Sequence, residues 1–162
     1  MPQNTYQSYF KSPIGTMELV ATDVGLSSLI FLDKDITSDT ITPPELRDAA
    51  TQIKEYFEGK RTEFDLKLDI QGTEFQLTVW KKLIEIPYSE TISYLQLAKR
   101  IGNVKAIRAV GTANGRNPIS IITPCHRVIG SNGDLTGYGG GLWRKDWLLK
   151  LENKVSGREL FD

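Results

Sequence analysis

The sequence predicts a small α/β lobe followed by a mainly helical lobe that contains a helix-turn-helix. Three observations predict this fold class. Short β-rich stretches dominate the first part of the chain, apolar residues recur at helical spacing from residue 73 onward, and a connector around Gly72 separates the two patterns. A chain of 162 residues with 40% hydrophobic residues is long enough for two such lobes. We therefore expect one domain over residues 1–72 and a second over residues 73–162.

The first lobe is expected to contain a small sheet and one helix. Residues 17–33 hold two β-rich stretches split by Asp23 and Gly25, which is typical of a hairpin. Residues 62–70 alternate between polar and apolar side chains and predict another strand.

Between these strands, residues 43–60 predict a helix. Pro44 suits its first turn and Gly59 ends it. An apolar stripe runs along it, formed by Leu46, Ala49, Ala50, Ile53, Tyr56 and Phe57.

The second lobe begins with a helix over residues 73–86, which Pro87 ends. Ser93 and Gln96 then form a Ser-x-x-Gln capping box that opens a short helix, and Gly102 ends that helix.

A second short helix follows over residues 105–117, so the two form a helix-turn-helix pattern. The last helix is expected over residues 141–153, and we expect the tail from Lys154 to lack order.

The second helix of the pair has two different faces. On a helical wheel Val104, Ile107 and Val110 share one side, which we expect to face the core. The opposite side combines two basic residues with small ones: Lys105, Ala106, Arg108, Ala109, Thr112 and Ala113. Small side chains cannot read base edges, but they let a helix approach the minor groove, whose code is degenerate. Packing against another helix is the alternative role of such a face.

Charge is distributed unevenly although the formal net charge is zero. Residues 33–90 hold 13 acids and 8 bases, whereas residues 91–133 hold six bases and no acid. The six are Lys99, Arg100, Lys105, Arg108, Arg116 and Arg127. A basic surface attracts phosphate backbones, so the pattern favours nucleic acid as a partner. Neutralisation of these bases by acids elsewhere in the fold is the alternative.

The only cysteine and the only histidine are adjacent, as Cys125 and His126. The pair alone is compatible with a buried structural cysteine beside a surface histidine. One cysteine forms no internal disulfide, and one cysteine with one histidine falls short of a structural zinc site. There is no run of 18 apolar residues and no secretory signal, so we expect a cytoplasmic protein of bacterial type without membrane contact. Nothing in the sequence demands a metal, a cofactor or more than one copy of the chain, so we expect a monomer without them.

Separated motifs in the second lobe resemble one known family. The motifs are RAVGTANGRNPISII at 108–122, PCHRV at 124–128 and GYGGGLWRKDWLLKLE at 137–152. In order and spacing they resemble the O6-alkylguanine-DNA alkyltransferases, also called methylated-DNA–protein-cysteine methyltransferases. The resemblance implies a ribonuclease H-like N-terminal lobe and a winged-helix-like helix-turn-helix in the C-terminal lobe. Some members bind zinc in the N-terminal lobe, but this sequence lacks the ligands.

The resemblance implies direct-reversal DNA repair by a single-turnover suicide enzyme. The alkyl group of O6-alkylguanine in duplex DNA would move irreversibly to Cys125 after nucleotide flipping. His126 would remove the thiol proton through a water, Glu152 would orient His126, and Asn117 would stabilise the turn before the cysteine. The preferred alkyl size and the reaction with O4-alkylthymine stay open.

Further roles follow from the same resemblance. Arg108 would fill the gap left by the flipped nucleotide, Tyr94 would push on its phosphate and hydrogen-bond the base, and Lys145 would assist the leaving oxygen. The implied DNA-binding residues are Tyr94, Ala106, Arg108, Ala109, Thr112, Ala113 and Arg116. The implied pocket residues are Pro124, Val128, Tyr138, Gly139, Gly140 and Trp143. Double-stranded DNA would be bound through its minor groove with little sequence preference.

The chemistry agrees with the residue types. A thiol with an ordinary pKa of about 8.5 is mostly protonated at neutral pH, and an imidazole in relay with a carboxylate makes the thiolate easier to form. Adjacent residues on an extended segment point to opposite faces, so Cys125 and His126 need a bridging water or a turn.

Three alternatives remain at the level of the sequence. An alkyltransferase-like protein binds lesions without transfer, but such relatives replace the acceptor cysteine, which is present here. A helix-turn-helix regulator would prefer a consensus site, and a Cys–His hydrolase would turn over many times.

Overall fold

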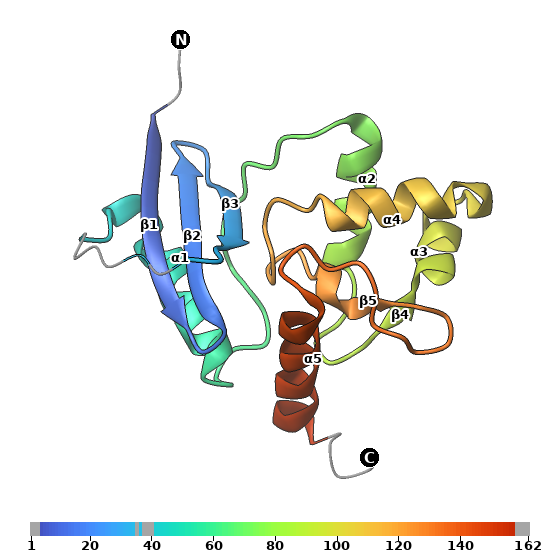
Figure 1. Cartoon of the computed structure of the whole chain (residues 1–162). Helices are drawn as coiled ribbons and strands as arrows, with labels where there is room; N and C mark the ends of the chain where they lie inside the picture. Colours follow the sequence, from blue (N-terminus) through green and yellow to red (C-terminus); the bar gives the residue numbers. More distant parts are fainter. Residues whose placement is uncertain (1–3, 35, 37–40, 158–162) are drawn as a thin grey trace. The chain divides into compact units, whose positions relative to one another are not determined.

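The computed structural model describes residues 4–34, 36 and 41–157. The chain divides into two compact units, Met1–Gln71 and Gly72–Asp162. The first contains a three-stranded sheet and a helix, and the second is mainly helical (Figure 1). This is the predicted fold class.

The sheet of the N-terminal unit is antiparallel in the order β1-β2-β3, with β1 over Thr5–Ser12, β2 over Gly15–Thr22 and β3 over Leu26–Phe31. Strands β2 and β3 confirm the predicted hairpin. Strand β1 was not predicted from the sequence. Its one buried residue is Ser8, which is polar, so the strand shows little hydrophobic alternation.

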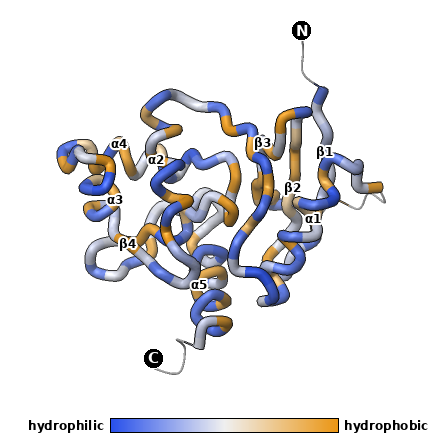
Figure 2. The backbone as a smooth tube through the Cα atoms, turned by 180° about the vertical axis from the view of Figure 1, so that it is seen from behind, coloured by the Kyte–Doolittle hydropathy of each residue, from blue (hydrophilic) through white to orange (hydrophobic). Residues whose placement is uncertain are grey.

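Helix α1 (Pro44–Phe57) confirms the predicted helix, with Pro44 in its first turn. Its apolar side chains form the core of this unit together with alternate residues of the sheet. The fully buried residues are Met17, Leu19, Leu29, Leu46, Ile53 and Tyr56. Figure 2 shows hydrophobic and hydrophilic positions interleaved along the chain of both units.

The predicted strand over residues 62–70 is wrong. Only Leu68 pairs with the sheet, as a single parallel bridge to Leu26. Two backbone hydrogen bonds hold this crossing, from the Leu26 N–H to the Lys67 carbonyl at 2.9 Å and from the Asp69 N–H to the Leu26 carbonyl at 2.7 Å. The segment crosses the end of β3 at one point instead of running beside it, so its alternating pattern has no ladder to join.

The C-terminal unit contains α2 (Glu74–Ile84), α3 (Tyr94–Ile101) and α4 (Ile107–Gly115), which pack on one another. The predicted Ser93 capping box is present, and Gly102 ends α3 with a φ of 91°. That left-handed conformation favours glycine, and it turns the chain tightly from α3 toward α4. The helix-turn-helix is therefore confirmed.

The predicted core face of the second helix is partly wrong. Val110 is fully buried, but Val104 and Ile107 are 49% and 37% exposed. Residues Val104–Ala106 form the 3₁₀ turn η1 ahead of α4, and a 3₁₀ turn places side chains at 120° rather than 100° intervals. An α-helical wheel therefore assigns the wrong face to the residues at this start.

The remaining elements follow the loop after α4. They are the 3₁₀ turn η2 (Cys125–Arg127), strand β5 (Val128–Ile129), which pairs in parallel with β4 (Ile92–Ser93), and α5 (Leu142–Ser156). The expectation of disorder from Lys154 is wrong for residues 154–156, which complete α5, while residues 158–162 lie outside the described residues. None of the described helices is long and apolar enough to cross a membrane.

Candidate functional site

The loop between α4 and Cys125 is closed by asparagine side chains. Asn117 Nδ2 donates to the Thr123 carbonyl at 2.7 Å and to the Ile119 carbonyl at 3.2 Å, and Asn117 Oδ1 accepts from the Ile119 N–H at 3.0 Å. Buried Asn114 donates Nδ2 to the Cys125 carbonyl at 3.4 Å. These bonds satisfy backbone groups that a buried loop would otherwise leave unpaired.

The same loop stores local backbone strain. Ile121 has a φ of 73°, in the left-handed region that a β-branched residue rarely adopts. Such a conformation persists only where surrounding contacts over-determine it, and it is often found next to functional sites. The bonds of Asn117 supply that constraint immediately before Cys125.

Cys125 is 5% exposed and begins η2. Its segment is a 3₁₀ turn, one of the two arrangements expected for the adjacent Cys125 and His126. Pro124 opens this tight turn, and the Arg127 N–H closes it by donating to the Pro124 carbonyl. Burial raises the pKa of the Cys125 thiol, while a hydrogen bond with Asn117 and the charge of Lys145 act in the opposite direction.

His126 is fully buried against Glu152 from α5. His126 Nε2 lies 2.7 Å from Glu152 Oε2. Since an ionised carboxylate only accepts hydrogen bonds, Nε2 carries the proton and Nδ1 keeps the free lone pair. Nδ1 has no hydrogen-bond partner among the described residues. The site thus holds a base nitrogen next to the thiol residue.

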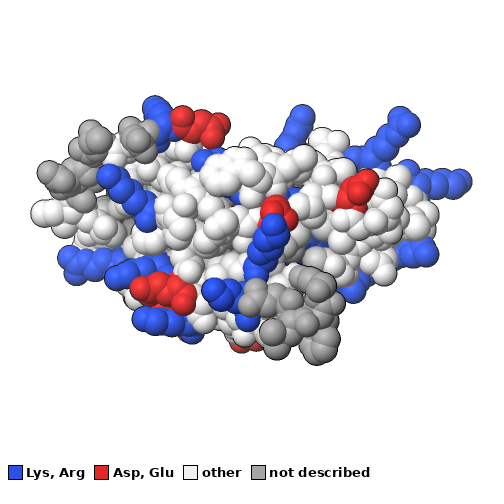
Figure 3. Space-filling view, turned by 60° about the horizontal axis from the view of Figure 1, so that its bottom comes forward, with Lys and Arg blue, Asp and Glu red and all other residues white. Residues whose placement is uncertain are grey.

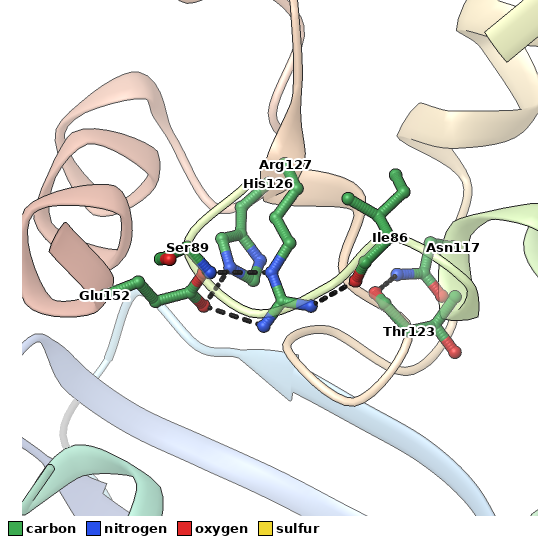
Figure 4. A network of polar contacts seen from close by, with 7 residues as sticks. All are labelled: Ile86, Ser89, Asn117, Thr123, His126, Arg127 and Glu152. Carbon is green, nitrogen blue, oxygen red and sulfur yellow. Dashed lines mark hydrogen bonds and ion pairs between the residues drawn. The ribbon is translucent and has the colours of Figure 1, made fainter. Parts of the chain in front are cut away.

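Arg127 completes the network and was not identified from the sequence (Figure 4). Its Nε donates to Glu152 Oε1 at 2.9 Å, its Nη2 to Glu152 Oε2 at 3.1 Å, and its Nη1 to the Ile86 carbonyl at 2.7 Å. The Ser89 N–H also donates to Glu152 Oε1, at 3.1 Å. Arg127 is one of the six bases expected to form a basic surface, and its burial corrects that expectation.

The protonation states follow from burial and these partners. Burial alone would raise the pKa of the Glu152 carboxyl, but the charges and hydrogen bonds of His126 and Arg127 outweigh it and hold that pKa well below its usual range. Burial lowers the pKa of His126, and it outweighs the opposite effect of Glu152. At neutral pH the pair is therefore a carboxylate and a neutral imidazole.

Lys145 and Tyr94 meet at the backbone of the loop before α5. Lys145 Nζ donates to the carbonyls of Val128 at 2.6 Å and Thr136 at 2.7 Å, and the Tyr94 hydroxyl donates to the Thr136 carbonyl at 3.0 Å. Lys145 Nζ also lies 5.8 Å from the centre of the Tyr94 ring. Burial lowers the pKa of Lys145 to about 8, against a smaller opposite effect of Cys125.

A groove of about 680 Å³ opens between α3, α4 and this loop. Its lining residues are Tyr94, Ile107, Arg108, Gly111, Thr112, Thr136 and Gly137. The structure therefore brings Tyr94, Arg108 and Thr112 together, as three of the sequence-predicted DNA-binding residues.

The other predicted DNA-binding residues lie on α4 and around it. Ala109 and Arg116 are exposed and Ala106 is half-buried, but Ala113 is buried and its carbonyl accepts a hydrogen bond from Trp80 Nε1 at 2.8 Å. The expectation that Ala113 is exposed is wrong, because that position faces α2. Figure 3 shows Lys and Arg side chains projecting from the end of the C-terminal unit that holds α3 and α4.

The predicted pocket residues divide into two groups. Pro124, Val128 and Tyr138 are buried, and burial followed by the nearby Cys125 raises the pKa of the Tyr138 hydroxyl. Gly139 is exposed and Gly140 is half-buried. Trp143 is 58% exposed, with the Arg144 guanidinium 4.7 Å from the centre of its ring. Among the described residues no cluster of His, Cys, Asp and Glu is suited to holding a metal ion.

Family models match almost the whole chain. Residues 74–154 match the model described as "6-O-methylguanine DNA methyltransferase, DNA binding domain", and residues 5–70 match "6-O-methylguanine DNA methyltransferase, ribonuclease-like domain".

Individual proteins agree with the models. The methylated-DNA–protein-cysteine methyltransferase of Methanosarcina mazei is 53% identical over 152 residues, which cover 91% of this chain and 96% of the relative. The crystal structure of the O6-methylguanine methyltransferase of Mycobacterium tuberculosis matches with a TM-score of 0.85 at 46% identity, over 98% of this chain and 100% of the other. The structure described as M. tuberculosis OGT in complex with DNA matches with a TM-score of 0.82 at 49% identity, over 91% of this chain and 92% of the other.

Proposed function

Because the chain belongs to the 6-O-methylguanine DNA methyltransferase family and repairs alkylated DNA by alkyl transfer, we propose that Cys125 is the residue that accepts the alkyl group. Cys125 is the only cysteine of the chain, so it is the only thiol available. The observation that carries this assignment is its place beside His126, whose Nε2 is occupied by Glu152 and whose Nδ1 has no partner among the described residues.

The proton path begins at the thiol. A water between Cys125 Sγ and His126 Nδ1 would pass the thiol proton to the imidazole, and Glu152 would stabilise the imidazolium that forms. Burial disfavours the charged sulfur in the resting protein, so the thiol needs this base to give up its proton.

The transfer step needs no other reactant. The thiolate sulfur attacks the alkyl carbon, a carbon–sulfur bond forms, the carbon–oxygen bond breaks, and its electron pair stays with the guanine. The guanine takes up one proton, so the net reaction converts O6-alkylguanine and thiol into guanine and thioether. Lys145, held near Cys125, would stabilise the developing negative charge on the base. The thioether has no leaving group, so each molecule reacts once.

DNA is the partner, and the groove on α3 and α4 is the surface we propose for it. The target carbon lies inside the stacked duplex, so the nucleotide must be extruded at a cost of a few kcal/mol, less for a damaged base. Arg108 lines the groove from an exposed position on α4 and would fill the vacated position. Tyr94, which lines the same groove from the start of α3, would exchange its bond to the Thr136 carbonyl for one to the nucleotide.

The small exposed residues of α4 favour the minor groove over sequence reading. Ala109 and Thr112 are exposed and short, so the helix backbone can approach the narrow groove without reaching base edges. We propose binding by a monomer with little sequence preference.

Intact-protein mass spectrometry with a duplex containing one O6-methylguanine tests the assignment. We expect a gain of one methyl group, mapped to Cys125 and saturating at one per protein. Cys125→Ala should gain nothing and still bind the duplex. Methylation at another residue, or repeated turnover without a mass gain, would overturn Cys125 as the acceptor.

A further inference from the structure

Arg127 is tied to two separate parts of the C-terminal unit, α5 and the connector after α2. Its guanidinium holds Glu152 of α5 with two nitrogens and the Ile86 carbonyl after α2 with the third. Its Cζ also lies 5.5 Å from the centre of the Tyr88 ring, in the turn that follows. The side chain is 7% exposed and Glu152 is fully buried. A buried bidentate arginine–carboxylate pair fixes both partners in orientation as well as in charge.

Arg127 and His126 share one carboxylate. Glu152 Oε2 accepts from Arg127 Nη2 at 3.1 Å and lies 2.7 Å from His126 Nε2. An unshared carboxylate at that distance would strongly favour an imidazolium, because opposite charges in a low-dielectric site attract strongly. The positive charge of Arg127 offsets part of that attraction.

We propose that Arg127 is a positioning residue that, acting through Glu152, keeps His126 in the neutral Nε2–H form from which Nδ1 can accept the thiol proton. This inference rests on the proposed role of His126 as the base for Cys125. Without Arg127, the Glu152 carboxylate would keep the Ser89 N–H and His126 but lose the positive charge of the guanidinium, and the imidazole would be protonated before the thiol could transfer its proton.

Other groups around the pair do not replace this effect. Lys145 of α5 also disfavours a charged His126, but its Nζ is held by the carbonyls of Val128 and Thr136 and not by Glu152. Burial raises the pKa of Tyr88 to about 12, so its hydroxyl is neutral at the pH values that matter here. Cys125 itself is neutral until it gives up its proton.

The first test is the pH dependence of the reaction of the whole protein with free O6-benzylguanine, which avoids DNA binding. Arg127→Met should shift the acid limb of the rate profile to higher pH by about one unit or more, the range expected when a nearby charge is removed. Arg127→Lys, a single ammonium that cannot hold the carboxylate bidentately, should shift it less. Arg47→Ala, which removes an exposed arginine of α1 in the N-terminal unit, is the matched control and should leave the limb in place.

Slower reaction with an unmoved acid limb would overturn the proposal, because a purely structural role for Arg127 predicts that result. Failure of the unmodified protein to alkylate Cys125 would instead overturn the proposed function.

A second measurement does not depend on the Arg127 variants being folded. The chain has one histidine, so long-range proton–nitrogen correlation spectra of labelled Cys125→Ala protein report His126 alone. We expect a proton on Nε2 and none on Nδ1 at neutral pH. An imidazolium, or an Nδ1–H tautomer, in the protein with Arg127 intact would overturn the proposal.

Discussion

At the residue scale, the protonation of His126 depends on whether the C-terminal unit is folded around it. It is fully buried, and burial lowers its pKa. The folded protein therefore resists taking up a proton that the unfolded chain accepts below its ordinary pKa of about 6.5.

This predicts a loss of stability at mildly acidic pH. Because the folded pKa lies below the unfolded one, the stability from neutral His126 is complete above about pH 6.5 and falls as pH drops below it. Below about pH 6.5 the free energy of unfolding should fall with a slope of at most about 1.4 kcal/mol per pH unit, the limit for uptake of one proton. Urea titrations at several pH values measure it. His126→Gln keeps a donor for Glu152, and it should flatten the slope in this window. An equal slope in both proteins would contradict the prediction.

A second prediction at the residue scale concerns the effect of Lys145 on the reaction rate. Its charge favours the Cys125 thiolate, and its pKa of about 8 leaves most molecules protonated at neutral pH. Lys145→Met should slow the reaction with free O6-benzylguanine by about tenfold or more, because losing a nearby opposite charge raises an acid's pKa by about one unit or more. Lys150→Met is the control, since Lys150 lies on the exposed side of α5 and pairs with Asp146. Equal rates for the Lys145 variant and the control would remove Lys145 from the chemistry.

At the scale of elements, short-range sequence signals predicted the structure correctly where neighbouring residues hydrogen-bond the free backbone groups of a helix end. The Ser93 capping box and the Gly102 stop are short-range features, and both are present in α3. The segment 62–70 shows the opposite case, because alternation does not say whether a neighbouring strand is available. Val104 and Ile107 lie in and just after a 3₁₀ turn whose different period a helical wheel does not represent.

The residues of the site likewise divide into those that the sequence indicates and those that only the folded structure brings together. The adjacency of Cys125 and His126 is visible in the sequence, and Glu152 followed from the resemblance. Arg127 carried no distinguishing signal, because its partners Ile86 and Glu152 are 41 and 25 residues away in sequence. A count of bases treats buried and exposed arginines alike.

Helix α4 carries the prediction at this scale. Arg108 lines the groove from an exposed position. Extrusion of the nucleotide costs a few kcal/mol, and Arg108→Ala would remove a side chain that offsets part of this cost, so it should slow repair of O6-methylguanine in duplex DNA by about 10- to 100-fold. The reaction with free O6-benzylguanine should change little. Arg100→Ala removes the same charge from an exposed position on α3 without removing a lining residue of the groove. Equal losses of Arg108→Ala on both substrates, or equal effects of the two variants on the duplex, would exclude the proposed role.

At the scale of the whole molecule, zero net charge conceals a basic surface on one unit. Of the six bases in residues 91–133, five are exposed and Arg127 is neutralised inside the fold. The exposed five are Lys99, Arg100, Lys105, Arg108 and Arg116. The electrostatic part of DNA binding should depend on these five, because buried charges release no counterions.

The salt dependence of duplex binding tests this count. With Cys125→Ala, which binds without reacting, the logarithm of the association constant should fall with the logarithm of salt concentration at a slope no steeper than roughly −4.5, or about −0.9 for each neutralised phosphate. Arg116→Ala should flatten the slope by about one and weaken binding to all duplexes alike. Lys150→Ala, on α5, should leave the slope unchanged. A markedly steeper slope would mean that cations other than these five reach the DNA. A loss confined to particular sequences would mean that Arg116 reads bases rather than phosphates.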